Sequence, residues 1–218
     1  MSYIDALFKK DEDRIYVVER DPKKGRVFVE YDARYVFYYP DARGKHRSMT
    51  GEPLQRVVCQ TNKEFIKEQR IRSNKQLYEH DINPVFRCLE ENYLGKETPK
   101  LNVMFFDIEV DFDPDRGYST TDDPFMPITA ISCYMSWTDQ LVTLAVPPKT
   151  ISMDDAKELT KRFDNTMLFE KEKDMLDAFL ELVQDADILS GWNSEGYDIP
   201  YTVGRIQKVL SSDDTRRL

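Results

Sequence analysis

The spacing of hydrophobic and polar positions in the first part of the chain predicts short strands. Residues 15–20 and 26–30 are rich in β-branched and aromatic side chains, and they flank the segment Asp21-Pro22-Lys23-Lys24-Gly25. Two such runs on either side of a turn that contains proline and glycine are typical of a β-hairpin. The chain is therefore expected to begin with antiparallel structure.

The pattern then changes from strand spacing to helix spacing. A strand is expected over residues 35–39 and another over residues 56–59. Thr61 follows as a candidate N-cap for a helix over residues 63–72, with Glu64 at the capping-box position. Together these elements predict a small mixed β/α domain.

The second half of the chain is more regular. Residues 101–110 are apolar at almost every position until the end of the run, which predicts a central strand covered on both faces. Further segments follow in the order strand, strand, helix, strand, helix, at residues 128–137, 140–146, 171–184, 186–190 and 197–210. Three strands, helix, strand and helix indicate an α/β fold.

Composition supports a folded protein outside the membrane. Hydrophobic residues make up 40% of the 218 positions and aromatic residues 12%, which is enough for a packed core. No stretch approaches the roughly 18 apolar residues of a membrane span, and the first residues lack the layout of a signal peptide. Cys59, Cys88 and Cys133 stand far apart and are expected to be reduced core residues of a cytoplasmic protein. With only two histidines present, carboxylates are the expected chemical groups of any site.

Charge divides the chain into two parts. Residues 1–99 contain 19 basic and 17 acidic side chains, whereas residues 100–218 contain 12 and 23. This step, from a net charge of +2 to one of −11, predicts a domain boundary near residues 98–100. The acidic half is not suited to binding nucleic acid through its own charge. It is suited to divalent cations, and the alternative is a solvated acidic surface.

Two carboxylates stand at the end of the predicted central strand. Asp107 and Glu109 are two residues apart, so the alternation of a strand places both on the same face. Two anions held together need a compensating positive charge. Hard cations such as Mg²⁺ or Mn²⁺ prefer oxygen ligands and would supply it. The alternative is a strand that simply ends in polar residues at the surface.

A third carboxylate occurs where a later strand turns into a helix. The segment from Gly191 to Tyr201 contains a polar turn and then Asp198, close to the expected start of a helix. Two interpretations of Asp198 stay open: an ordinary helix N-cap, or a third acidic group presented beside the central strand.

These segments resemble, in order, the N-terminal part of family B DNA polymerases, and most of all those of T-even-type bacteriophages. The segment Phe106-Asp107-Ile108-Glu109 is similar to the first exonuclease motif of the family. The second motif resembles Gly191-Trp192-Asn193 and Tyr197-Asp198-Ile199-Pro200-Tyr201, continuing to Arg205. Other similar segments are Gly51-Glu52-Pro53 with Arg56, Tyr78-Glu79-His80-Asp81-Ile82 with Arg87, and residues 127–132. The resemblance covers essentially the whole chain.

The resemblance implies a fold and a set of metal ligands. The fold would be a ribonuclease-H-like exonuclease domain at residues 100–218, preceded by the polymerase N-terminal domain at residues 1–99. Matched to the motifs, Asp107, Glu109 and Asp198 would be three of the four carboxylates that bind two Mg²⁺ or Mn²⁺ ions.

The resemblance also implies a substrate. It would be DNA, namely the single-stranded 3′ end of a primer-template, from which nucleotides are removed one at a time in proofreading. Asn193 and Tyr197 would help to shape the site and hold the strand. Tyr118 would correspond to the aromatic residue that wedges against the terminal base, and the alternative is a loop residue packed on the surface.

The chain also departs from the family pattern. The third exonuclease motif, a tyrosine and an aspartate on a later helix, has no counterpart before Leu218, and the palm, fingers and thumb are absent. We therefore expect weak or no nuclease activity from this chain alone. The remainder of the polymerase would be a partner chain or a missing part, and the expected location is the host cytoplasm.

Two other classes of function stay open. One is a non-catalytic binding or assembly module, in which the basic stretches at residues 43–47 and 70–75 contact nucleic acid or a partner polypeptide. The other is an independent ribonuclease-H-like nuclease that acts on RNA.

Overall fold

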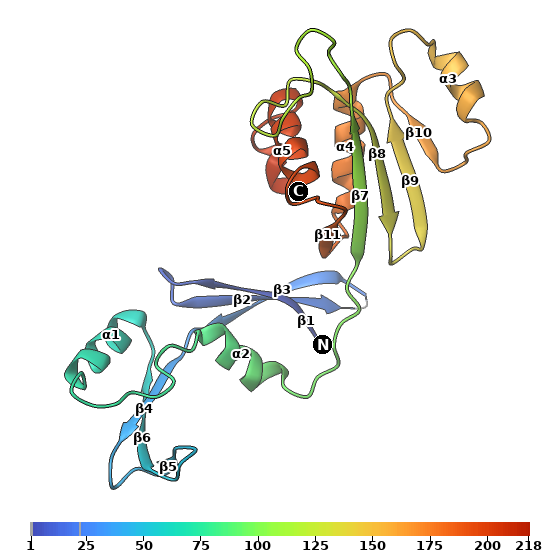
Figure 1. Ribbon diagram of the computed structural model, residues 1–218. Coiled ribbons are helices and arrows are strands. Elements are labelled where there is room, and N and C mark those ends of the chain that lie inside the picture. Colours follow the sequence, from blue (N-terminus) through green and yellow to red (C-terminus); the bar gives the residue numbers. More distant parts are fainter. Residues whose placement is uncertain (1, 22) are drawn as a thin grey trace. The chain divides into compact units, whose positions relative to one another are not determined.

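The computed structural model describes residues 2–21 and 23–218, and the chain separates into two compact units, residues 1–100 and 101–218 (Figure 1). Pro22, in the predicted hairpin turn, lies outside the described residues. None of the helices formed by the described residues is both long enough and apolar enough to cross a membrane.

The described residues of the first unit form two three-stranded sheets and two helices. One sheet has the order β1–β2–β3 and is antiparallel, with strands β1 (Tyr3–Lys9), β2 (Arg14–Asp21) and β3 (Gly25–Asp32). The other has the order β4–β6–β5, with strands β4 (Tyr35–Pro40), β6 (Pro53–Cys59) and β5 (His46–Arg47). The helices are α1 (Asn62–Ile71) and α2 (Pro84–Tyr93). The predicted hairpin, the strands β4 and β6 and the helix α1 are confirmed, while β1, β5 and α2 were not predicted.

Capping explains where the two helices begin. The Thr61 hydroxyl accepts the backbone N–H of Glu64 at 3.2 Å, as the sequence predicts. The Glu64 carboxylate accepts the N–H of Gln60 at 2.9 Å, one residue before the expected partner. In α2, the Asn83 side chain accepts the N–H of Val85 at 3.0 Å, and Pro84 occupies the first turn, where its missing N–H has no cost. Asn83 followed by Pro84 marks the start of α2 in the sequence, although no helix was predicted from this pair.

The second unit is built on one five-stranded mixed sheet with the order β10–β9–β8–β7–β11. Its strands are β7 (Val103–Val110), β8 (Ile128–Met135), β9 (Gln140–Ala145), β10 (Thr166–Leu168) and β11 (Ile188–Ser190). Strands β7, β8 and β9 are antiparallel neighbours, while β11 runs parallel to β7 and β10 parallel to β9. The helices are α3 (Met153–Thr160), α4 (Glu172–Val183) and α5 (Asp198–Val209), followed by a short 3₁₀ helix, η1 (Asp214–Arg217). This α/β architecture agrees with the predicted fold class.

The predicted order of elements was incomplete. Helix α3 and strand β10 lie between β9 and α4 and were not predicted. The three residues of β10 are too few to show an alternating pattern. Helix α3 has only eight residues, although Ser152 caps it by accepting the N–H of Asp155 at 3.1 Å.

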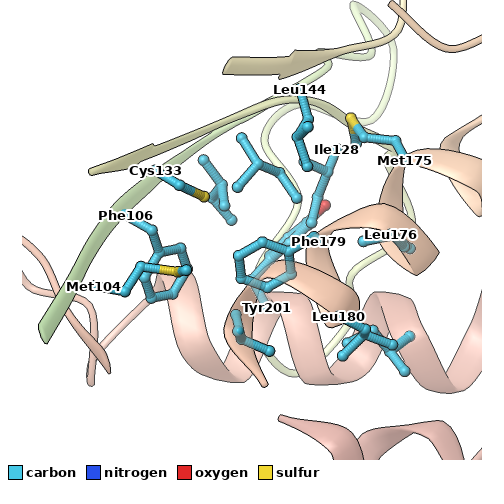
Figure 2. Close-up of a cluster of buried hydrophobic side chains, with 14 of the residues drawn as sticks. Met104, Phe106, Ile128, Cys133, Leu144, Met175, Leu176, Phe179, Leu180 and Tyr201 are labelled. Atoms are coloured by element: carbon cyan, nitrogen blue, oxygen red, sulfur yellow. The ribbon is translucent and has the colours of Figure 1, made fainter. Parts of the chain in front are cut away.

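One face of the sheet packs on helices and forms the core of the second unit (Figure 2). The Phe106 ring of β7 lies 5.5 Å from the Phe179 ring of α4, measured between centroids. The largest side chains that are fully buried in this cluster include Met104, Ile131, Leu144, Met175, Leu176, Phe179, Leu180 and Tyr201. Truncation of such an aromatic side chain typically costs about 3–5 kcal/mol, so this layer holds β7 and α4 together.

The prediction that β7 is covered on both faces is wrong. Its side chains alternate between buried and exposed positions, and Phe105 is 48% exposed. Asp107 and Glu109 share that open face. The segment was predicted to be buried on both faces because Phe105 is apolar. Whether the face that carries Phe105 is buried depends on which other elements pack against the sheet, and the local sequence pattern does not show this.

Candidate functional site

Asp107 and Glu109 project from the open face of β7, as their spacing predicts. Across the sheet, Asp107 is paired with Ser132 of β8 and Glu109 with Ala130. The register shifts between Glu109 and Val110, where the strand ends. The two carboxylates are exposed and lie near the carboxyl end of β7.

Strand β11 stops beside β7 before it reaches these carboxylates. Its last residue, Ser190, pairs with Phe105, and Gly191 then lies against the Phe106 carbonyl. A Cβ atom at residue 191 would lie 2.4 Å from that carbonyl oxygen. Glycine is therefore required at this position by the close approach of two backbones.

A tight turn then brings the chain back to β7. Asn193 has a φ of +54°, in the left-handed region that asparagine tolerates better than most residues. Its carbonyl accepts the N–H groups of Gly196 at 2.9 Å and Tyr197 at 3.1 Å. The turn ends at Tyr197, and α5 begins with Asp198.

Asp198 is held against β7 by a hydrogen bond. Its Oδ1 atom accepts the backbone N–H of Ile108 at 3.2 Å, and its side chain is buried at 5% exposure. The helix has no side-chain N-cap bond. The N-cap interpretation of Asp198 is therefore not what the structure shows, because Asp198 is the first residue of the helix and its carboxylate accepts a hydrogen bond from β7.

The charge of Asp107 acts on the carboxylate of Asp198. Burial is the largest cause that raises the pKa of Asp198, and the neighbouring charge of Asp107 raises it further. The hydrogen bond from Ile108 acts in the opposite direction. Two neighbouring carboxylates, one of them buried, form a place where a bound cation would be stabilised.

The carboxylate oxygens of Asp107, Glu109 and Asp198 are the kind of ligand that a hard divalent cation prefers, although these side chains do not surround a single point. In the described part of the chain, no three His, Cys, Asp or Glu side chains are grouped so that they could hold a metal ion. Asp107 and Asp198 are brought together, and Glu109 follows on the same strand face without completing such a group. Mg²⁺ commonly takes only one or two carboxylates from a protein and keeps several waters, so this pair is compatible with it.

The sequence also predicted three residues that contact the substrate, namely Tyr118, Asn193 and Tyr197. The Tyr197 ring stacks on the Tyr201 ring, with 5.3 Å between their centroids. Burial raises the pKa of Tyr197, and the charge of the adjacent Asp198 raises it further. Asn193 is exposed in the turn. Tyr118 is 84% exposed in the loop after β7, with its ring 4.9 Å from that of Phe112.

Sequence reasoning missed a buried ion pair that anchors this region. Arg205 of α5 donates through Nε to Oε1 of Glu172 at 2.8 Å and through Nη2 to the second carboxylate oxygen. Its Nη1 donates to the Pro124 carbonyl at 2.9 Å, and Oε1 of Glu172 also accepts the N–H of Ile128 at 2.8 Å. The pair thus joins α4, α5 and the loop before β8. No local signal marks Glu172, because its partner is 33 residues away.

A shallow hollow beside Asp107 was also missed. It has a volume of about 600 Å³, and its walls include Phe105, Tyr134, Leu141 and Trp192. The first three are direct neighbours across β7, β8 and β9. The open face of the sheet therefore carries an apolar row next to the row that contains Asp107.

Comparisons with known proteins find similarity to DNA polymerases over most of the chain. Residues 57–218 match the family described as DNA polymerase family B, exonuclease domain. The chain is 27% identical over 214 residues to the DNA-directed DNA polymerase of Escherichia phage RB69, which covers 87% of this chain and 24% of that protein. It is 29% identical over 117 residues to the DNA polymerase catalytic subunit of Saimiriine herpesvirus 2 (strain 11), covering 53% of this chain and 11% of that protein. The chain thus spans a quarter or less of the length of these relatives.

Proposed function

This chain belongs to the exonuclease-domain family of the family B DNA polymerases, and we propose that its second unit carries most of a 3′–5′ proofreading exonuclease site. The observation that carries the proposal is the hydrogen bond from Ile108 to Asp198. It joins two segments 90 residues apart and brings a third acidic residue to the strand that already carries Asp107 and Glu109. A surface with unrelated acidic residues would not need this bond.

Each of the three carboxylates has a distinct place in the proposed site. Asp107 and Glu109 would present oxygen ligands from one strand face, and Asp198 would present a third that Ile108 holds in orientation. Mg²⁺ or Mn²⁺ ions bound there would provide an activated water and neutralise charge on the scissile phosphate. Burial and, to a smaller extent, the negative charge of Asp107 raise the pKa of Asp198, and a bound cation would be favoured by these two neighbouring carboxylates.

The proposed substrate is the single-stranded 3′ end of DNA at a primer-template. A mismatched end separates more readily from its template, so it reaches a site of this kind more often than a paired end does. Tyr118 and Asn193 are exposed and Tyr197 is half-buried. In the sequence, Tyr118 follows the segment of Asp107 and Glu109, and the other two precede Asp198. We propose that Tyr118 contacts the terminal base, and that Asn193 and Tyr197 help to hold the strand.

The chain is proposed to act as the N-terminal portion of a replicative polymerase in the cytoplasm of a phage-infected host. The remainder of the polymerase, present as a second chain or as a continuation of this one, would supply the other ligand of the site. Residues 1–99 would be the N-terminal domain of the polymerase, and residues 100–218 the first part of its exonuclease domain.

A degradation assay tests the proposal. A single-stranded oligodeoxynucleotide labelled at its 5′ end is incubated with the chain in Mg²⁺, Mn²⁺ or EDTA, and its products are resolved on a gel. Slow shortening from the 3′ end, or none, is expected because the described residues form no group of three metal ligands. Any shortening should stop in EDTA and in Asp107→Ala, but continue in Asp154→Ala, an exposed acidic residue of α3.

Three results would contradict parts of the proposal. Shortening that Asp107→Ala does not affect would remove the assigned site. Rapid metal-dependent digestion that Asp107→Ala abolishes would show that the carboxylates of this chain are sufficient. Faster shortening of an RNA oligonucleotide than of DNA would favour an independent nuclease that acts on RNA.

A further inference from the structure

Helix α1 turns one side to the core of the first unit and the other side to solvent. On the inner side, the Phe65 ring lies 5.2 Å from that of Tyr35 and 5.8 Å from that of Phe37, measured between centroids. Residues three and four positions apart share one face of a helix, and the solvent side of α1 follows this spacing. We call its five exposed residues the outer face of α1, namely Lys63, Ile66, Lys67, Arg70 and Ile71.

A shallow hollow of about 650 Å³ lies over this outer face. The five residues form its walls together with Thr61 and Glu64 at the start of the helix. Ile66 is 39% exposed and Ile71 is 62% exposed. With about 3.6 residues per turn, the two isoleucines stand at opposite edges of the face and the three cations lie between them. The aliphatic stems of lysine and arginine add apolar surface below their charged ends, so the hollow combines apolar walls with positive charge.

The three cations of the outer face have no anionic partner in the described part of the chain. No carboxylate of residues 2–21 and 23–218 lies within ion-pair distance of Lys63, Lys67 or Arg70. The acidic residue of the hollow, Glu64, is engaged at the start of the helix, where its carboxylate accepts the Gln60 N–H at 2.9 Å. The charge over the hollow is therefore positive.

Neighbouring basic residues are used within the fold itself. Arg72, on the inner side, forms an ion pair with Glu68. The Arg72 guanidinium and the Lys75 ammonium also lie over the Tyr39 ring, 4.9 and 4.4 Å from its centroid. Arg70 is thus the basic residue of the stretch at residues 70–75 that remains available to a partner.

The outer face carries a charge pattern that disfavours the helix on its own. Lys63 and Lys67 are four residues apart, and Lys67 and Arg70 are three apart. Like charges at these spacings repel each other along a helix. Lys63 also lies in the first turn of α1, where the helix dipole disfavours a cation. An anionic partner would relieve both effects.

We propose that the outer face of α1 is a docking site for an acidic segment of a partner protein. Carboxylates of that segment pair with Lys63, Lys67 and Arg70, while its apolar side chains cover Ile66 and Ile71. Charge complementarity selects the acidic partner. Exposed ion pairs alone contribute little, so burial of the two isoleucines supplies the remaining affinity.

Nucleic acid is the less suitable occupant of this hollow. Proteins that bind single strands use aromatic rings on which bases stack, and no aromatic side chain is among the described residues that line the hollow. The docking site lies on the first unit and does not depend on the proposed exonuclease activity.

Fluorescence anisotropy with a labelled synthetic peptide, DDELDDILDDED, tests the proposal on the full chain. Binding is expected at low salt and should weaken as salt is added, since exposed charges are screened. Lys67→Ala/Arg70→Ala should weaken binding about five- to ten-fold, because two ion pairs are lost. Ile66→Ser/Ile71→Ser keeps every charge and should still weaken binding about five-fold, because the apolar contact is lost.

Matched controls separate docking on the outer face from a general attraction between charges. Arg43→Ala/Lys45→Ala removes the same charge from another part of the first unit and should change affinity less than about two-fold. The peptide NNQLNNILNNQN, in which amides replace all carboxylates, should bind at least about ten-fold more weakly. Thermal unfolding followed by circular dichroism shows whether each variant is folded. The single variant Ile71→Ser replaces the double isoleucine variant if that one unfolds.

The proposal is overturned if the Arg43/Lys45 variant loses as much affinity as the Lys67/Arg70 variant, or if the isoleucine variants bind the peptide normally. Absence of peptide binding at low salt and concentrations on the order of 1 mM would also overturn it. Tighter binding of a 12-mer of oligodeoxythymidylate than of the peptide, lost in Lys67→Ala/Arg70→Ala, would assign the outer face to nucleic acid instead.

Discussion

Replacing Arg205 by methionine should destabilise the second unit more than any surface change. Arg205 is 8% exposed, and the Glu172 side chain with which it pairs is 11% exposed. Methionine fills similar space but removes every donor, so the Glu172 carboxylate stays buried without a cation and the Pro124 carbonyl loses a donor. Breaking one side of a buried pair typically costs about 3–5 kcal/mol. For a unit of this size that corresponds to a fall in melting temperature on the order of 10–20 °C.

Tryptophan fluorescence during urea unfolding measures this cost in the correct unit. Both tryptophans, Trp137 and Trp192, belong to residues 101–218, and Trp137 packs against the core there. The free energy of unfolding from the fluorescence transition therefore reports the second unit, while the first unit contributes little to the signal.

Two further variants show whether the loss of unfolding free energy comes from the Arg205–Glu172 ion pair or from mutation in general. Lys161→Met removes one partner of an exposed pair with Glu158 and should cost less than about 1 kcal/mol. The double variant Arg205→Met/Glu172→Met should cost less than the sum of the two single variants, because no charge is left buried. A cost below about 1 kcal/mol for Arg205→Met, or strict additivity in the double variant, would refute the argument.

Two further predictions concern close packing and thiol chemistry. Gly191→Ala should destabilise the second unit by about 1–3 kcal/mol in urea unfolding, because the new methyl group meets the Phe106 backbone. Gly196→Ala, which meets only a side chain that can rotate, should cost less, and equal costs would contradict the reasoning. Burial raises the pKa of Cys133 to about 12 and that of Cys59 to about 11, so neither thiol should react with a disulfide reagent at pH 8 until the chain is denatured. Rapid reaction of the native protein would show that these residues are accessible.

Local signals predicted the longer elements well. The hairpin of β2 and β3, the start of α1 at Thr61 and the helices α4 and α5 follow from strand alternation, capping and helical spacing within a few residues of each boundary. The same alternation placed Asp107 and Glu109 on one face, and the structure confirms that both are exposed there. Each of these features depends on interactions between residues close in sequence.

Features that depend on partners far away in the sequence could not be predicted from local patterns. Phe105 looked buried in the pattern, yet it lies on the open face because only the opposite face of β7 packs against α4. The pairing of Arg205 with Glu172 joins positions 33 residues apart with no shared local motif. The contact of Asp198 with Ile108 could be expected only from the resemblance to a family, since 90 residues separate the two.

Manganese binding followed by electron paramagnetic resonance tests most directly whether Asp107 and Asp198 form a cation site. The double variant Asp107→Asn/Asp198→Asn removes both charges, while the amide oxygen at residue 198 can still accept the N–H of Ile108. We expect the tightest Mn²⁺ site of the wild-type chain to disappear in this variant but to remain in the charge-matched control Asp122→Asn/Asp154→Asn. The same Mn²⁺ affinity in the wild-type chain and the Asp107/Asp198 variant would contradict this expectation.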